Sequence, residues 1–184
     1  KHLTHMLTTK YIQSRLAEIA QEKAVRLLFA IESGSRAWGM ASPDSDYDVR
    51  FVYARDQDDY LSLQDNKEMI GPIMEHDGEL DLVGWDVRKF LKHIVQSNPN
   101  VLEWLNSPIR YVEQPGVFDQ LEVLADMNFC PHRTVAHYLG IAIGAYQAGY
   151  EDGKWSLKKF GYYLRPILAA HYVMHQQRRN PISF

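Results

Sequence analysis

Apolar positions in the first third of the chain follow two different spacings. Ile12, Leu16 and Ile19 recur at helical spacing, which predicts an amphipathic helix. The short run RLLFAI is continuously apolar and predicts a buried strand, and the run VRFVY is apolar and alternating enough to predict a second strand. The elements expected here are a helix over residues 9–22, strands over 26–31 and 49–53, and a brief helix over 59–65.

A hairpin is predicted next, because Asp77-Gly78 separates two strand-like runs. The runs cover residues 67–75 and 79–86. In the second run Leu80 and Leu82 fall on one face, while Glu79, Asp81 and Val83 fall on the other.

From residue 87 onward the pattern is helical. Helices are expected over residues 88–96, 101–106, 117–126, 134–150 and 156–177. The join between an α/β part and an all-helical part is expected near residues 108–115. The chain is therefore expected to be an α+β protein, with an α/β subdomain over residues 1–110 that holds a mixed sheet and a helical subdomain over residues 111–184.

Composition places the chain among ordinary globular proteins. It has 184 residues, 46% of them hydrophobic and 23% charged, with a formal net charge of -3, so there is no overall attraction to nucleic acid. The single cysteine, Cys130, suits a reducing compartment. No apolar run is long enough to span a membrane, and residues 1–6 lack the apolar core of a signal peptide. We expect a cytoplasmic protein without a membrane partner.

The first strand runs into Ser33-Gly34-Ser35-Arg36. Gly34 allows the backbone to approach a phosphate closely, and Ser35 adds a hydroxyl and a main-chain N–H where a helix would start. Both are expected to bind a phosphate group. Arg36 is either a phosphate ligand beside them or an exposed helix residue.

An Asp-x-Asp sequence, Asp46 and Asp48, opens the next strand. On a strand this spacing turns both carboxylates to one side, where oxygen ligands suit Mg²⁺, or Mn²⁺ in its place. Asp81 on a later strand would complete a second metal position, and two metals can clamp the attacking and leaving oxygens at phosphorus. By itself Asp-x-Asp also fits a polar turn before a strand. Asp86 and Glu79 are weaker alternatives to Asp81.

Basic residues gather toward the carboxy-terminal end. Lys158, Tyr162 and Arg165 share one helical face, which is either a triphosphate-binding face or a solvated basic surface. The cations of this region are Lys154, Lys158, Lys159, Arg165, Arg178 and Arg179. Arg50 points to the same side as Asp46 and Asp48 by alternation, and is either their charge partner or a substrate contact.

The order Gly-Ser, Asp-x-Asp and a third carboxylate resembles the signature of the DNA-polymerase-β-like nucleotidyltransferases. Within that superfamily the chain is most similar to the YcgL-type proteins, also grouped as the RNA-repair-pathway polymerase-β-like family. Three further stretches carry this resemblance, and they are ELDLVGWDVRKFL from Glu79, SNPNVLEWL from Ser97 and LKKFGYYLRPILA from Leu157.

The resemblance implies transfer of a nucleoside monophosphate from a triphosphate to a hydroxyl group, with release of pyrophosphate. It matches Gly34 and Ser35 to the phosphate-binding turn and Asp46, Asp48 and Asp81 to the three catalytic, metal-binding carboxylates. It also points to RNA ends as the acceptor. A non-catalytic nucleotide-binding sensor or antitoxin-like module is the alternative. Because the cations are localised, we expect weak binding to single-stranded RNA or an RNA terminus and little binding to a duplex.

Overall fold

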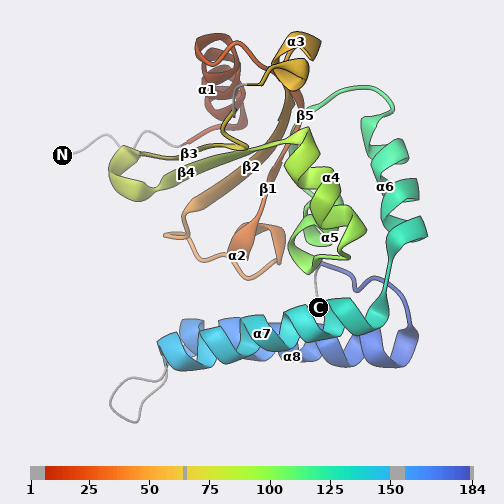
Figure 1. Ribbon diagram of the computed structural model, residues 1–184. Coiled ribbons are helices and arrows are strands. Elements are labelled where there is room, and N and C mark those ends of the chain that lie inside the picture. The colour runs from red at the N-terminus through yellow and green to blue at the C-terminus, as the bar shows by residue number, and fades with distance from the viewer. Residues whose placement is uncertain (1–6, 64–65, 150–155, 183–184) are drawn as a thin grey trace, which may run out of the picture. The chain divides into compact units, whose positions relative to one another are not determined.

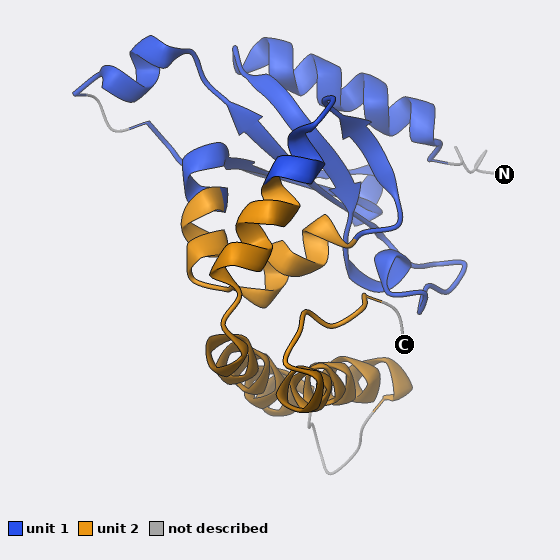
Figure 2. Cartoon of the chain, turned by 90° about the vertical axis from the view of Figure 1, so that its right-hand side faces the viewer, with its two compact units in different colours: residues 1–90, 107–120, 183–184 blue, residues 91–106, 121–182 orange. Residues whose placement is uncertain are grey.

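The computed structural model describes residues 7–63, 66–149 and 156–182. The chain forms two compact units, each built from separated segments (Figure 2). Unit 1 comprises Lys1–Phe90, Ser107–Gln120 and Ser183–Phe184, and unit 2 comprises Leu91–Asn106 and Leu121–Ile182. The subdomain boundary after residue 110 stays a prediction.

Unit 1 is built on a five-stranded mixed sheet in the order β3-β4-β2-β1-β5 (Figure 1). Its strands are β1 (Arg26–Glu32), β2 (Tyr47–Ala54), β3 (Met69–Glu75), β4 (Leu80–Asp86) and β5 (Arg110–Glu113). β2 and β4 are parallel, whereas the pairs β1–β2, β1–β5 and β3–β4 are antiparallel. The start of β2 therefore lies beside the start of β4.

Helix α1 (Thr9–Glu22) covers one face of this sheet. Ile12, Leu16 and Ile19 are fully buried against alternate strand residues, and Thr8 caps the helix by accepting the N–H of Tyr11. The strand residues of this core include Ala30, Val49, Phe51, Leu80 and Leu82.

The opposite face of the sheet buries aromatic side chains. Phe29 packs edge-on against Phe90, with ring centroids 5.3 Å apart, and lies 4.9 Å from the ring of Phe118. Phe90 belongs to α4 (Val87–Val95) and Phe118 to α6 (Val117–Asn128), helices whose later residues belong to unit 2. Two short elements complete this part of the chain, α2 (Gly34–Ala37) and α3 (Gln57–Leu61).

Unit 2 contains α5 (Pro99–Leu105), α7 (Pro131–Gly149) and α8 (Leu157–Gln176). Helices α7 and α8 lie side by side and antiparallel (Figure 1). Tyr138 of α7 and Ala169, Ala170 and Val173 of α8 form the buried cluster between these helices. Among the described helices, none has the length and apolar content required to cross a membrane.

The predicted α+β class with a mixed sheet and several helices is confirmed. The first helix has the predicted bounds, and the 67–75 and 79–86 runs form the antiparallel β3–β4 pair, joined by a short 3₁₀ turn over His76–Gly78. The brief helix predicted over residues 59–65 instead ends at Leu61, and residues 64–65 are outside the described chain. Strand β5 was not predicted, because its four residues gain their strand character from pairing with β1.

Candidate functional site

The turn after β1 brings Gly34 against the side chain of Asp48. Gly34 has φ +59°, and a Cβ at this position would collide with the carboxylate of Asp48. The main-chain N–H of Ser33 donates to the carbonyl of Asp48 at 2.8 Å, which fixes the turn to the start of β2. Glycine is therefore required at residue 34 both by the backbone conformation and by the space that Asp48 fills. Ser35 follows in α2 and is buried.

Arg36 is tied to the loop that precedes β2. Its guanidinium donates to the carbonyls of Ser45 at 2.6 Å and Asp46 at 3.1 Å, and it stacks over the ring of Tyr47 at 3.8 Å. Asp46 itself is exposed and lies directly before β2. Arg36 thus positions the main chain of the Asp46 loop, while a role for it in phosphate binding stays a prediction.

Asp48 and Asp81 are neighbours across the parallel strands. The register of β2 and β4 pairs Asp48 directly with Asp81. Of the two alternatives to Asp81, Asp86 is buried and accepts the N–H of Arg88 at 2.8 Å, which caps α4. Glu79 lies exposed in the turn before β4. The register therefore pairs Asp81 with Asp48, while the carbonyl of Glu79 accepts the N–H of Tyr47 at 2.7 Å. The role of Asp81 as the third carboxylate stays a prediction.

Arg50 links the two carboxylates. Its Nη2 lies 3.2 Å from Oδ1 of Asp48 and 2.8 Å from Oδ2 of Asp81. The sequence had left Arg50 either as a charge partner or as a substrate contact. In the structure it is the charge partner of both aspartates.

Glu32, at the end of β1, supports the start of β2 from inside unit 1. Its fully buried carboxylate accepts the N–H of Asp48 at 2.8 Å and the hydroxyl of Tyr111 at 2.6 Å. Burial raises the pKa of Glu32 to about 7, although both hydrogen bonds oppose this shift. The sequence did not indicate Glu32 as a site residue, because a single acidic residue at the end of an apolar run is typical of a strand end exposed to solvent.

The donor set at Asp48 and Asp81 fits a divalent cation. Both residues offer carboxylate oxygens, which hard cations prefer, and both already share one positive group. Oδ1 of Asp81 is buried and has no hydrogen-bond partner in the described part of the chain. Within residues 7–63, 66–149 and 156–182, however, no three Asp, Glu, His or Cys side chains are grouped as a metal site. A metal held by all three aspartates stays a prediction.

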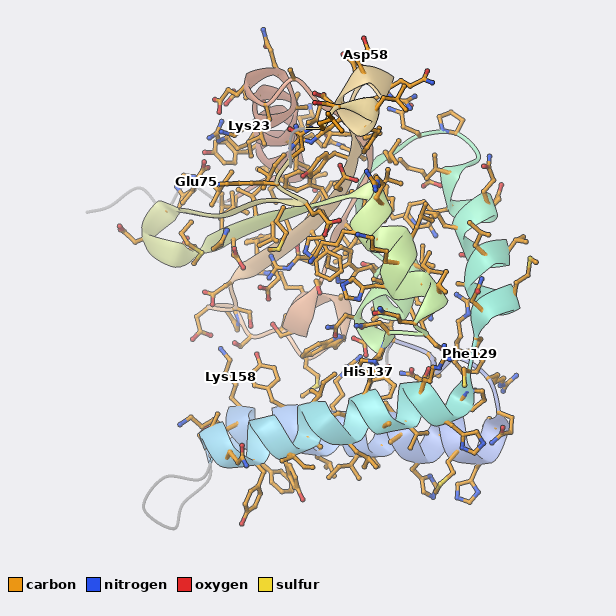
Figure 3. All side chains as sticks on the ribbon, in the orientation of Figure 1. Lys23, Asp58, Glu75, Phe129, His137 and Lys158 are labelled. Carbon is orange, nitrogen blue, oxygen red and sulfur yellow. The ribbon has the colours of Figure 1, made fainter. Side chains whose placement is uncertain are left out.

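The three residues of the basic face predicted on α8 differ in how exposed they are within unit 2. Lys158 is exposed in the first turn (Figure 3) and Tyr162 is half-buried. Arg165 is buried, and its Nη1 pairs with Oε1 of Glu103 at 3.0 Å. Triphosphate binding by these three residues stays a prediction.

Two of the other carboxy-terminal cations also have side-chain partners. Arg179 pairs with Asp126 at 2.9 Å, and Arg178 donates to the hydroxyl of Tyr172 at 2.9 Å. Lys154 lies outside the described residues. Glu103, the partner of Arg165, lies 62 residues away along the chain, so no local pattern in the sequence predicts this pair.

Comparison with known proteins identifies the family of the chain. The family model described as "RNA repair pathway DNA polymerase beta family" (RlaP) matches residues 8–184. A relative from Bacillus subtilis (strain 168), "Uncharacterized protein YcgL", is 40% identical over 174 residues. The match covers 94% of this chain and 66% of that relative, so the chain spans slightly less than two thirds of its length. The chain belongs to the RNA repair pathway DNA polymerase beta family.

Proposed function

We propose that this chain is a metal-dependent nucleotidyltransferase that moves a nucleoside monophosphate from a nucleoside triphosphate to a hydroxyl acceptor and releases pyrophosphate. The observation that carries the proposal is the pairing of Asp48 with Asp81 across β2 and β4, beside the turn at Gly34. Membership of a polymerase-β family supports the same chemistry.

Residues of unit 1 would bind the metal, bind the phosphates and position the main chain. Asp48 and Asp81 would hold Mg²⁺ or Mn²⁺, with Asp46 as the third carboxylate. The cation supplies positive charge that stabilises the phosphate oxygens and lowers the pKa of a hydroxyl nucleophile. Gly34 and Ser35 approach the phosphates, while Arg36 and Glu32 hold the main chain of the Asp46–Asp48 segment in place. The protein needs no covalent step, because positioning and charge neutralisation dominate this kind of transfer.

The test combines each labelled nucleoside triphosphate with Mg²⁺ or Mn²⁺ and measures pyrophosphate release, with and without a short RNA. Asp48→Asn and Asp81→Asn should each lower the rate by roughly 100-fold or more, the effect of losing several kcal/mol of charge stabilisation. The matched control is Asp58→Asn, an exposed aspartate of α3 in the same unit (Figure 3), which should leave the rate unchanged. Wild-type activity in Asp48→Asn would overturn the proposal.

A nucleotide-binding sensor or antitoxin-like module is the second candidate. It is favoured by the pairing of Arg50 with Asp48 and Asp81, because both carboxylates already have a counter-charge without a metal. Triphosphate binding by calorimetry, without pyrophosphate release in the presence of any acceptor offered, would establish this alternative.

The proposed acceptor is a single-stranded RNA end. The chain is net acidic at -3, and several carboxy-terminal cations are paired within unit 2, so a long duplex would meet little positive surface. Fluorescence anisotropy at low and moderate salt should show weak, salt-sensitive binding of a short single strand and weaker binding of a matched duplex. Tighter duplex binding would contradict this acceptor, and no binding to either would favour a small-molecule or protein hydroxyl.

A further inference from the structure

Arg50 is anchored to the backbone of two strands and to two carboxylates at once. Its Nη1 donates to the carbonyls of Val49 at 3.1 Å and Asp81 at 3.2 Å. Its Nη2 faces the side chains of Asp48 and Asp81. The main-chain bonds do not depend on the carboxylates, so Arg50 can release a carboxylate and remain attached to β2 and β4.

The charges of this cluster are unequal. Two carboxylates share one guanidinium, so the formal charges of these three side chains sum to -1, and the side chains are only 19% to 32% exposed. A divalent ion at the same oxygens would, however, lie within a few ångströms of the guanidinium and be repelled by it.

Asp81 makes the competition direct. Its Oδ2 is bonded to Arg50 at 2.8 Å, and its Oδ1 is buried with no hydrogen-bond partner among the residues that the structure describes. A cation that binds Asp81 therefore competes with Arg50 at Oδ2, or requires the carboxylate to rotate so that Oδ1 becomes accessible. The buried Oδ1 also makes the metal-free arrangement costly, since a carboxylate oxygen without a donor loses its hydration.

We propose that Arg50 is a built-in competitor of the divalent cation: it pairs with Asp48 and Asp81 in the metal-free protein, and metal binding to Asp81 weakens or breaks that ion pair. This inference rests on the proposed function, because a cation at Asp48 and Asp81 is part of that function. Arg50 thereby sets the metal affinity of the site and stabilises the protein when no metal is bound.

The experiment measures Mn²⁺ affinity by calorimetry and the melting temperature in EDTA and in Mn²⁺, for the wild type and Arg50→Gln. Arg50→Gln should bind Mn²⁺ roughly tenfold or more tightly, the scale on which one nearby charge shifts an ionic equilibrium. In EDTA it should melt below the wild type, because two neighbouring carboxylates lose their shared cation. Its melting temperature should rise further on adding Mn²⁺ than that of the wild type.

Arg15→Gln is the matched control. Arg15 also belongs to unit 1 and pairs with three carboxylates, Glu75 at 2.6 Å (Figure 3 labels Glu75), Glu18 at 3.0 Å and Glu22 at 3.5 Å. Its side chain is 21% exposed against 19% for Arg50. Arg15→Gln should lower the melting temperature in EDTA and leave Mn²⁺ affinity unchanged. Arg50→Lys, which keeps the charge but loses the planar fork, is the second variant and should tighten Mn²⁺ binding by a smaller factor.

The outcomes separate the two proposals. Equal or weaker Mn²⁺ binding by Arg50→Gln and Arg50→Lys, with clear binding by the wild type, overturns the role of Arg50 and leaves the proposed function standing. Absence of Mn²⁺ binding in the wild type, in Arg15→Gln and in both Arg50 variants overturns the metal-dependent function itself.

Discussion

Arg50 in unit 1 and Arg165 in unit 2 both pair with carboxylates, but in different surroundings. Arg165 and Glu103 are only 6% and 11% exposed, and they form an ion pair at 3.0 Å. The hydroxyl of Tyr138 lies 2.9 Å from Glu103, and Arg165 also donates to the carbonyl of Ile182. Arg50 instead pairs with two carboxylates, and these three side chains are 19% to 32% exposed.

The difference separates a structural ion pair from one that can rearrange. When one charge of a buried pair is removed, the other charge stays away from water without that counter-charge. A partly exposed pair in which two carboxylates share one guanidinium can exchange its cation, because water and ions reach it. Charge balance and exposure together, rather than the residue types, distinguish the two.

The largest effect is expected at Arg165. Arg165→Met should lower the free energy of unfolding by about 3–5 kcal/mol, because Glu103 is left buried without its cation. Lys158→Met, on the same helix but exposed (Figure 3), should change it by less than about 0.5 kcal/mol. Chemical denaturation measures both, and Arg50→Gln provides the comparison, with an expected loss of about 1 kcal/mol. Equal losses for the Arg165 and Arg50 variants would show that the buried pair is no more important for stability than the partly exposed one.

Glu32 extends the comparison to a buried carboxylate whose direct partners are neutral donors, the N–H of Asp48 and the hydroxyl of Tyr111. Its pKa rises from 4.5 to about 7 on folding, so the folded protein holds this proton more tightly than the unfolded chain. The free energy of unfolding should therefore fall as pH rises from 4.5 to about 7, by roughly 3 kcal/mol at about 1.4 kcal/mol per pKa unit.

The measurement is chemical denaturation of the wild type and Glu32→Gln, at about pH 5 and about pH 8, on either side of most of this titration. Glu32→Gln should lack this part of the pH dependence and should be the more stable protein at the higher pH. The same pH dependence in both proteins would show that Glu32 is not its source.

A smaller effect on stability is expected from disturbing the packing of Gly34 against the carboxylate of Asp48. Gly34→Ala should lower the free energy of unfolding by about 1–2 kcal/mol more than Gly39→Ala, because the new methyl group displaces the carboxylate of Asp48. Gly39 is the matched control, since its φ is +73° and a Cβ there meets nothing within 4 Å. Gly34→Ala should also weaken Mn²⁺ binding, measured by calorimetry. Similar stability and similar Mn²⁺ affinity in the two variants would contradict a close packing of Gly34 on Asp48.

Local patterns in the sequence were sufficient for most of the elements. The helical spacing of Ile12, Leu16 and Ile19 predicts α1, which has the predicted bounds. The spacing is informative because the three side chains share the side of the helix that is fully buried. Alternation in β4 correctly separates Leu80 and Leu82 from Asp81. These patterns depend on neighbours within a few residues, which is why a single sequence contains them.

Only the tertiary structure decided which charges meet. Asp48 and Asp81 are register partners although 33 positions apart, and this follows from the parallel pairing of β2 with β4, which no local pattern specifies. Arg165 shares a helical face with Lys158 in the sequence, yet it is buried because Glu103, 62 residues away, supplies its counter-charge. The sequence by itself determined the elements and the candidate carboxylates, whereas long-range packing determined their partners, because burial and charge pairing depend on residues that the fold brings together.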